Sequence, residues 1–410
     1  MTRERCSRCL YWSDHPLGIV FDTDGLCSGC RTHQEKTDLD WDGRFSLLEK
    51  RLSRALRRRN ADHDCVVAVR GTPEYFYEID VLTNQLGLRV LAVNYNSQFG
   101  SDVGIRNLAR LRDRFDLDFM SYTTNPVTYR KLVRESILRL GSLRWPALAG
   151  ETQLPVRIAL ERRVPMVIWP YHQPTEMVGT HSYLEEIEMT RAGRHSFDLM
   201  GIEPLDMISH RGLLRPHEVE DLLYPSDGEL DRSGLTGLYL ANYLPWDSRR
   251  YAEEAVANMG ALSARNERTF DTYDRVDDLA YMGLHDMLKV ARHGYGRVTD
   301  SLCREIRFGR IDRQTALELE AYYLAQYPSE LLTMFSDWIG ASADGLEWIA
   351  TWEASGRLFP GEVERNPSEF ANLSETARAF VARFEENHAP LTSDQGFTLL
   401  GKGLELDEVV

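Results

Sequence analysis

Between residues 64 and 169, short apolar runs alternate with segments of helical periodicity, and this alternation restricts the possible fold more than any other feature of the sequence. The apolar runs are rich in β-branched and aromatic residues, as buried parallel strands are. They cover residues 65–69, 88–95, 118–122 and 166–169. Helices are predicted over residues 74–86, 103–115, 127–140 and 154–161. The alternation predicts an α/β fold with a doubly wound parallel sheet, in which ligands bind beyond the carboxyl ends of the strands.

Two Cys-x-x-Cys pairs lie near the N-terminus, Cys6 with Cys9 and Cys27 with Cys30. Four thiolates at this spacing are able to surround one Zn²⁺ ion tetrahedrally, so we expect a structural zinc site. Residues 18–22 between the pairs have the character of a short strand, which gives the layout of a zinc ribbon. Four reduced cysteines without a metal are the alternative. The remaining two, Cys65 and Cys303, are predicted to be ordinary core residues.

Beyond residue 179 the alternation stops and helical patterns dominate. Residues 237–243 suit one more strand, and helices are predicted over residues 279–292, 302–307, 313–327, 331–352 and 374–386. We therefore expect four parts: a zinc ribbon over residues 1–40, an α/β domain over 41–180, a mostly helical substrate or partner region over 181–360, and an acidic tail over 361–410.

The chain is acidic, with 48 lysines and arginines against 63 aspartates and glutamates, a formal net charge of −15. Phosphate contacts need lysine and arginine, so a nucleic-acid coat protein or a polybasic membrane binder is excluded, and nucleic acid is not an expected partner. No apolar run approaches the roughly 20 residues that cross a bilayer. Residues 1–11 lack the apolar centre of a secretory signal. We expect a cytoplasmic protein that does not associate with membranes.

Several stretches between Cys6 and Phe359 together resemble the N-acetyl sugar amidotransferases of bacterial surface-polysaccharide and nonulosonic-acid biosynthesis. They include the paired cysteines, DCVVAV, LAVNYNSQFGSDVGIRNL, VPMVIW, GLYLANYLPWDS and GLHDMLKVARHGYGRVTDSLCREIRFGRI, of which the last two are long and specific. The resemblance implies a PP-loop ATP-pyrophosphatase fold of the adenine nucleotide alpha hydrolase type. It also implies that ATP with Mg²⁺ adenylylates the acetamido oxygen of a sugar and that ammonia then displaces AMP, leaving an amidine. The ammonia is expected from a partner glutaminase and its synthase subunit.

The chain departs from that family at the nucleotide loop. The family has Ser-Gly-Gly-x-Asp-Ser after the first strand, whereas this chain reads RGTPEY over residues 70–75. Pro73 lacks an N–H group, Glu74 places a carboxylate near the phosphate position, and Thr72 is expected to cap the following helix. We expect the usual ATP site to be lost. The alternative is an altered, working site in which Arg70 binds phosphate bidentately. The nucleotide-loop positions are Val69, Arg70, Gly71, Thr72 and Asn94.

A second set of departures lies after residues 166–169. Pro170, Tyr171 and His172 stand where the family has Gly-Glu-Asn, and the Cys-His that the family shows before Ala-Gly is missing from residues 145–150. Glu176 matches a family glutamate and is the candidate catalytic residue, positioning a substrate hydroxyl or ammonia. A loop carboxylate with a capping role is the alternative.

The predicted substrate-binding residues are Trp145, His285, Tyr295, Arg297 and Asp300. Glycines on both sides of Tyr295 allow a ligand close to the backbone, and an arginine at 297 suits a phosphate. A tight turn with an Arg297–Asp300 ion pair is the alternative, as is a packed His285. His285 and its neighbour Asp286 face different ways on a helix and do not form a dyad. Trp246 is expected either to stack on a sugar or, rather more, to pack in the core.

Three functions follow from these patterns. The first is an amidotransferase-like enzyme acting on a small amide or a sugar nucleotide, with its ATP site altered or lost. The second is a non-catalytic scaffold or regulatory relative of that family. The third is a diverged PP-loop enzyme of another natural-product or RNA-modification pathway, against which the acidic balance counts.

Overall fold

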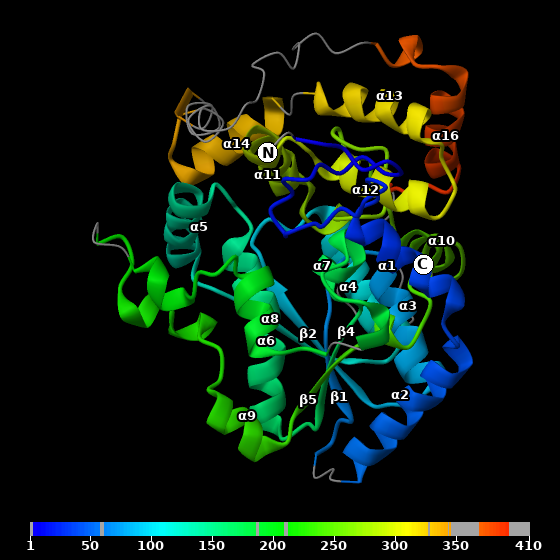
Figure 1. Cartoon of the computed structure of the whole chain (residues 1–410). Helices are drawn as coiled ribbons and strands as arrows, with labels where there is room; N and C mark the ends of the chain where they lie inside the picture. Colours follow the sequence, from blue (N-terminus) through cyan, green and yellow to red (C-terminus); the bar gives the residue numbers. More distant parts are fainter. Residues whose placement is uncertain are drawn as a thin grey trace, which may run out of the picture.

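The computed structural model describes residues 3–57, 61–185, 188–208, 212–326, 329–342, 344–345 and 369–392. A parallel sheet of five strands, in the order β3-β2-β1-β4-β5, carries the fold (Figure 1). The strands are β1 (Cys65–Ala68), β2 (Val90–Asn96), β3 (Asp118–Thr123), β4 (Met166–Trp169) and β5 (Thr236–Tyr239). Val66 in the central strand pairs with Leu91 on one side and Val167 on the other. The prediction of a parallel α/β sheet is therefore confirmed.

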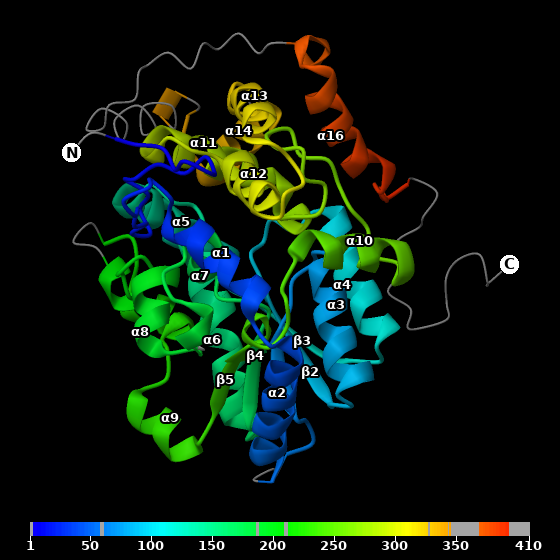
Figure 2. The same cartoon turned by 45° about the vertical axis from the view of Figure 1, so that its right-hand side comes forward.

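Helices cover both faces of the sheet (Figure 2). One face packs against α5 (Pro126–Leu140) and α6 (Trp145–Arg162), and the other against α2 (Trp41–Leu56), α3 (Glu74–Asp80), α4 (Asp102–Arg114) and α10 (Ser248–Asn258). Shorter helices are α7 (Gln173–Val178), α8 (Arg191–Gly193) and α9 (Asp227–Ser233). Local sequence explains the helix ends. Asn125 caps α5 from its side chain, Pro126 starts it, and Gly141 ends it at φ 58°.

The C-terminal helices form a layer at one end of the sheet, next to the cysteine segment (Figures 1 and 2). They are α11 (Leu279–His293), α12 (Arg297–Arg307), α13 (Arg313–Leu324), α14 (Ser329–Ile339) and α16 (Glu375–Glu386). The cysteine segment leads into α1 (Ser28–Asp38). It shares one apolar core with α12, in which the N–H of Leu10 donates to Sγ of Cys303 at 3.3 Å. The two ends of the described chain are therefore packed together.

Several predicted elements differ in the structure. Residues 18–22 do not form a strand; an isolated bridge joins Phe21 to Cys27 instead. Residues 237–243 start as β5 and then turn into a 3-10 helix at Leu240–Asn242. The helix predicted at 302 begins at Arg297, so the glycine-containing turn is shorter than expected. The last part of the helix predicted over 331–352, and the tail beyond 392, lie outside the described residues. Among the helices of the described part, none is long and apolar enough to cross a membrane.

Candidate functional site

The four predicted ligand cysteines come together in one buried cluster. Their sulfur atoms all lie within 4.8 Å of one another, with Cys6 to Cys30 at 4.0 Å and Cys9 to Cys27 at 3.6 Å. A tetrahedral Zn²⁺ with Zn–S bonds of about 2.3 Å places its sulfurs about 3.8 Å apart. The cluster therefore fits a metal such as zinc.

Backbone N–H groups and an arginine surround the cysteine cluster and stabilise the negative charge of its thiolates. Backbone N–H groups of Arg8, Cys9 and Cys27 point at Sγ of Cys6, at 3.3–3.4 Å. Nη2 of Arg307, from α12, lies 3.9 Å from Sγ of Cys27. Four thiolates around one divalent ion carry two net negative charges, and these donors stabilise that charge.

A cavity of about 600 Å³ lies between the cysteine segment, the C-terminal helices and the loop after β4. This size is within the range of sites for small organic ligands. Eight cationic side chains and six carboxylates line it, so its wall is positive although the whole chain is acidic. The cations are Arg144, Arg249, Arg275, Lys289, Arg292, Arg297, Arg304 and Arg307. We call it the large cavity; Glu176, His285, Tyr295, Arg297 and Asp300 of the predicted site line it.

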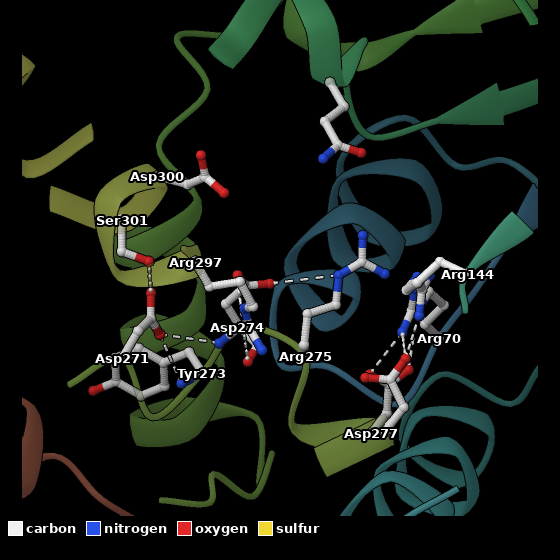
Figure 3. A network of polar contacts seen from close by, with 12 residues as sticks. Arg70, Arg144, Asp271, Tyr273, Asp274, Arg275, Asp277, Arg297, Asp300 and Ser301 are labelled. Atoms are coloured by element: carbon white, nitrogen blue, oxygen red, sulfur yellow. Dashed lines mark hydrogen bonds and ion pairs between the residues drawn. The ribbon is translucent and has the colours of Figure 1, made fainter. Parts of the chain in front are cut away.

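The loop of residues 271–278, DTYDRVDD, forms ion pairs with arginines that line the large cavity. Figure 3 shows Asp274 turned toward Arg297, and Asp277 turned toward Arg70 and Arg144. Oδ2 of Asp271 accepts from Arg304 at 2.7 Å, and Oδ2 of Asp274 pairs with Arg297 at 2.9 Å. We call this segment the acidic loop. It holds the cationic helix beside the strand ends.

Arg275, in the middle of the acidic loop, is held differently from its neighbours. Its backbone has φ 57°, a left-handed conformation that is uncommon for a residue other than glycine. Its Nε lies 3.8 Å from Asp274, beyond hydrogen-bond distance, and its side chain is 20% exposed (Figure 3). A guanidinium in this position is available to a ligand.

Donor atoms without partners face the same cavity. Within the part of the chain that the structure describes, Nε and Nη1 of Arg297 and Nδ1 of His285 are buried and have no hydrogen-bond partner. Burial, with the charges of Arg144 and Lys289, lowers the pKa of His285 well below its ordinary value, so this imidazole is neutral. Buried guanidinium N–H groups are costly unless an acceptor meets them. The cavity is therefore built for a ligand with acceptor atoms.

Arg70 of the nucleotide loop is fully engaged by carboxylates. It donates to both oxygens of Asp277 at 2.9 and 3.0 Å, to Asp278 at 3.0 Å, and pairs with Glu151 at 3.2 Å. Arg144 pairs with the same Asp278 and Glu151. Burial lowers the pKa of Arg70, but these carboxylates outweigh it and hold that pKa well above its ordinary value. A phosphate would have to displace three carboxylates to reach this guanidinium.

The other nucleotide-loop positions have structural contacts. A Cβ on Gly71 would lie 2.2 Å from the carbonyl oxygen of Gly104, so this turn needs glycine to pack against α4. Nδ2 of Asn94 donates to the carbonyl of Val69 at 2.9 Å, which links β2 to the end of β1. The prediction that Thr72 caps α3 is wrong. The helix begins at Glu74 with Pro73 as its N-cap, and the Thr72 hydroxyl, in the wall of a pocket, has no partner among the described residues.

Glu74 lines both that pocket and the large cavity. Burial, reinforced by Asp274, raises the pKa of Glu74 to about 8, so its carboxyl is protonated at neutral pH. Glu74, Tyr171, Asp274 and Arg275 line both spaces. The nucleotide loop therefore opens onto the same site as the C-terminal helices.

The remaining predicted residues are distributed unevenly. Glu176 faces the large cavity but is paired with the buried Lys36, at 2.7 and 3.0 Å. Asp300 accepts from Tyr11 at 2.8 Å and pairs with Lys289, and Arg297 pairs with Asp274, so the Arg297–Asp300 ion pair of the alternative interpretation is not formed. Trp145 is buried, and its indole N–H donates to backbone carbonyls.

Two further residues have the expected structural roles. Asp286 binds Arg268 at 2.6 Å, away from any dyad with His285. Trp246 is a core residue, 2% exposed, as one of the two alternatives proposed.

Sequence reasoning missed the acidic loop. Four aspartates occur within eight residues, directly before an apolar helix. This pattern indicates a segment that pairs with arginines from elsewhere in the chain, because buried arginines need carboxylate partners. The positive φ of Arg275 had no such signal.

Comparison with known families assigns the part of the chain that holds this loop. Residues 267–372 match the model of the C-terminal domain of WbpG-like LPS biosynthesis proteins. No curated protein matches the chain as a relative. The match supports membership of a polysaccharide biosynthesis family, and the matched segment contains Arg275, His285 and Arg297.

Proposed function

We propose that the protein binds a phosphorylated N-acetyl sugar, such as a sugar nucleotide, in the large cavity and modifies it in polysaccharide biosynthesis. The observation that carries this proposal is the set of buried, unpartnered N–H donors of Arg297, beside the unpartnered Nδ1 of His285, in a positively lined cavity. Sugar nucleotides combine anionic phosphates with many acceptor oxygens, which suits arginine. The match to a WbpG-like domain over the same segment supports this choice.

The reaction that the resemblance favours is conversion of an acetamido group to an amidine with ammonia from a partner glutaminase. The new C–N bond replaces the C–O bond, so the oxygen has to leave on a phosphoryl group supplied by a nucleoside triphosphate. Glu176 remains the candidate for positioning the acceptor group, with Lys36 holding its carboxylate in place. The triphosphate is not proposed to bind at the family's nucleotide loop, where Arg70 is committed to Asp277, Asp278 and Glu151 and Glu74 adds a further carboxyl.

Calorimetric titration of the full chain with UDP-N-acetylglucosamine tests the binding step. Arg275→Gly is the informative variant, because glycine adopts φ 57° without strain and the fold should keep its stability. Losing one charge-assisted contact should weaken binding roughly tenfold to a hundredfold. Arg265→Gln, on a side chain 71% exposed and outside the cavity, is the control. Equal affinities in Arg275→Gly and wild-type protein would refute the assignment of the cavity.

A non-catalytic relative is the second candidate, and the locked nucleotide loop favours it. Both candidates bind the sugar nucleotide, so the distinction needs a product assay. Incubation with ammonia, a nucleoside triphosphate with Mg²⁺ and the sugar nucleotide, followed by mass spectrometry, would show amidine formation for an enzyme and unchanged sugar for a scaffold. Co-purification of RNA would instead favour an RNA-modification role.

A further inference from the structure

The cysteine segment supplies part of the wall of the large cavity. Tyr11, Pro16 and Leu17 lie between the two Cys-x-x-Cys pairs and line the cavity, as does His33 from α1. The hydroxyl of Tyr11 donates to Asp300 of α12 at 2.8 Å. Segments of this kind usually fold only with their metal bound. We therefore expect the shape of this wall to depend on the metal.

The second Cys-x-x-Cys pair contacts two helices that line the cavity. Ser28, between its cysteines, donates from its hydroxyl to the carbonyl of Val178, the last residue of α7, at 2.5 Å. The helix α1 lies beside α7 (Figures 1 and 2). Gly29 allows α12 to come equally close, because a Cβ at this position would overlap the guanidinium of Arg307. Both helices are therefore held next to the metal centre, our name for the set Cys6, Cys9, Cys27 and Cys30.

Arg307 is shared by the metal centre and the large cavity. Its Nη2 lies 3.9 Å from Sγ of Cys27, and its Nη1 donates to the backbone carbonyl of Glu176 at 3.0 Å. The residue lines the large cavity, and its Nε is buried and has no hydrogen-bond partner within the described chain. A ligand acceptor that reaches Nε would remove the cost of this unpaired donor.

The charge of the metal centre by itself would oppose an anionic ligand nearby. Four thiolates around one divalent ion carry two net negative charges, and these repel an anion. Three arginines offset them: Arg307 at Cys27, Arg8, which donates to the carbonyl of Arg307 at 3.0 Å, and Arg313, which donates to the carbonyl of Cys9 at 3.4 Å. With these charges included the centre is not negative, so the ordering of the wall decides how the metal affects a ligand.

We propose that Arg307 couples the metal centre to the ligand site, so that the metal and the ligand each strengthen the binding of the other. The metal keeps the thiolate of Cys27 charged, and the thiolate holds the guanidinium in place against α7. A ligand then meets a donor that is already ordered, which reduces the entropy lost on binding. Because coupling between two sites is reciprocal, the same ligand has to increase the affinity for the metal by the same factor.

Arg304 provides a matched comparison on the same helix. It lines the same cavity, and its guanidinium pairs with Asp271 at 2.7 Å. Arg304→Gln should weaken ligand binding and keep the coupling, because Arg307 stays in its place. The choice of ligand rests on the proposed function, and Arg307 acts as a positioning residue.

Zinc competition measures the coupling. The full, zinc-loaded chain is titrated with a chelator of known zinc affinity, with and without saturating UDP-N-acetylglucosamine. The sugar nucleotide should raise the apparent zinc affinity at least about fivefold in wild-type protein and in Arg304→Gln. This increase should be absent in Arg307→Gln and partly restored in Arg307→Lys, which keeps the charge. Melting curves verify that each variant is folded.

Cobalt in place of zinc reports on Cys27 directly and needs no variant. The thiolate-to-cobalt absorption band should shift when UDP-N-acetylglucosamine binds, because the ligand changes the contact between Arg307 and Sγ of Cys27. The same ligand should leave the band of Arg307→Gln unchanged. A purely structural role of Arg307 would lower the melting temperature of the variant, but the band of wild-type protein would not respond to the ligand.

Two results would overturn the proposal: a sugar nucleotide that binds without changing the zinc affinity or the cobalt band, or full coupling in folded Arg307→Gln. In both cases the proposed function stands and only the coupling falls. If zinc-loaded wild-type protein binds no UDP-N-acetylglucosamine, the proposed function falls and the coupling falls with it.

Discussion

Replacing Arg70 by methionine separates a structural ion-pair network from a phosphate-binding residue. Methionine keeps an unbranched side chain but removes the charge that Asp277, Asp278 and Glu151 share. Arg144 still pairs with Asp278 and Glu151, so Asp277 loses its guanidinium partner at 12% exposure. Leaving a buried carboxylate unpaired costs about 3–5 kcal/mol.

Thermal unfolding measures this cost. In a chain of this size it corresponds to a fall in Tm on the order of 4–6 °C. The control Arg265→Met removes an exposed pair with Glu385 and should cost about 1 kcal/mol or less. The double variant Arg70→Met, Asp277→Asn should recover part of the loss, because the unpaired charge is gone.

The opposite outcome is equally clear. If Arg70→Met lowers the free energy of unfolding by no more than about 1 kcal/mol but abolishes micromolar ATP binding, the guanidinium binds a nucleotide and our interpretation is wrong. We expect no such binding in wild-type protein.

The remaining predictions concern the metal, the pH dependence of stability and the nucleotide. Purified protein should contain about one equivalent of zinc by elemental analysis, and Cys27→Ser should lower both the zinc content and the Tm; a metal-free chain with unchanged melting contradicts this. The pKa of Glu74 is about 8 when folded and 4.5 by default, so the folded state binds the extra proton in this window and stability falls as the pH rises through it. The Tm of Glu74→Gln should therefore equal that of wild-type protein near pH 5 and exceed it by a few degrees at pH 8. If the difference in Tm between the two proteins does not change with pH, the raised pKa of Glu74 is disproved. Calorimetry should find ATP binding no tighter than millimolar, and a micromolar constant would restore the nucleotide site.

Much of the fold was predictable because strand and helix patterns are local. The runs at Cys65–Ala68 and Met166–Trp169 are apolar on every residue, and only a sheet covered on both faces buries such a run. The cysteine spacing was equally informative, since four thiolates at that spacing have few other uses. The strand expected at 18–22 failed because a short β-branched run without a paired neighbour has no ladder to join.

The candidate site was predicted only in part. Tyr295, Arg297 and Asp300 do line the large cavity, as the two glycines flanking Tyr295 and the arginine that follows them suggested. Their partners were missed, because Arg297 pairs with Asp274 and Asp300 with Lys289, residues that are 23 and 11 positions away in the chain.

The sequence by itself determined the parallel sheet, the cysteine cluster and the loss of the family's loop residues at 70–75. These depend on periodicity, spacing and residue type, which are properties of short segments. Only the tertiary structure decided what Arg70 does. Its guanidinium meets Asp277 and Asp278 because the acidic loop returns to the strand ends after some two hundred residues. The interaction between two charges depends on the distance between them in space. For segments that are remote in the sequence, that distance is set by the packing of the whole chain and not by any local pattern.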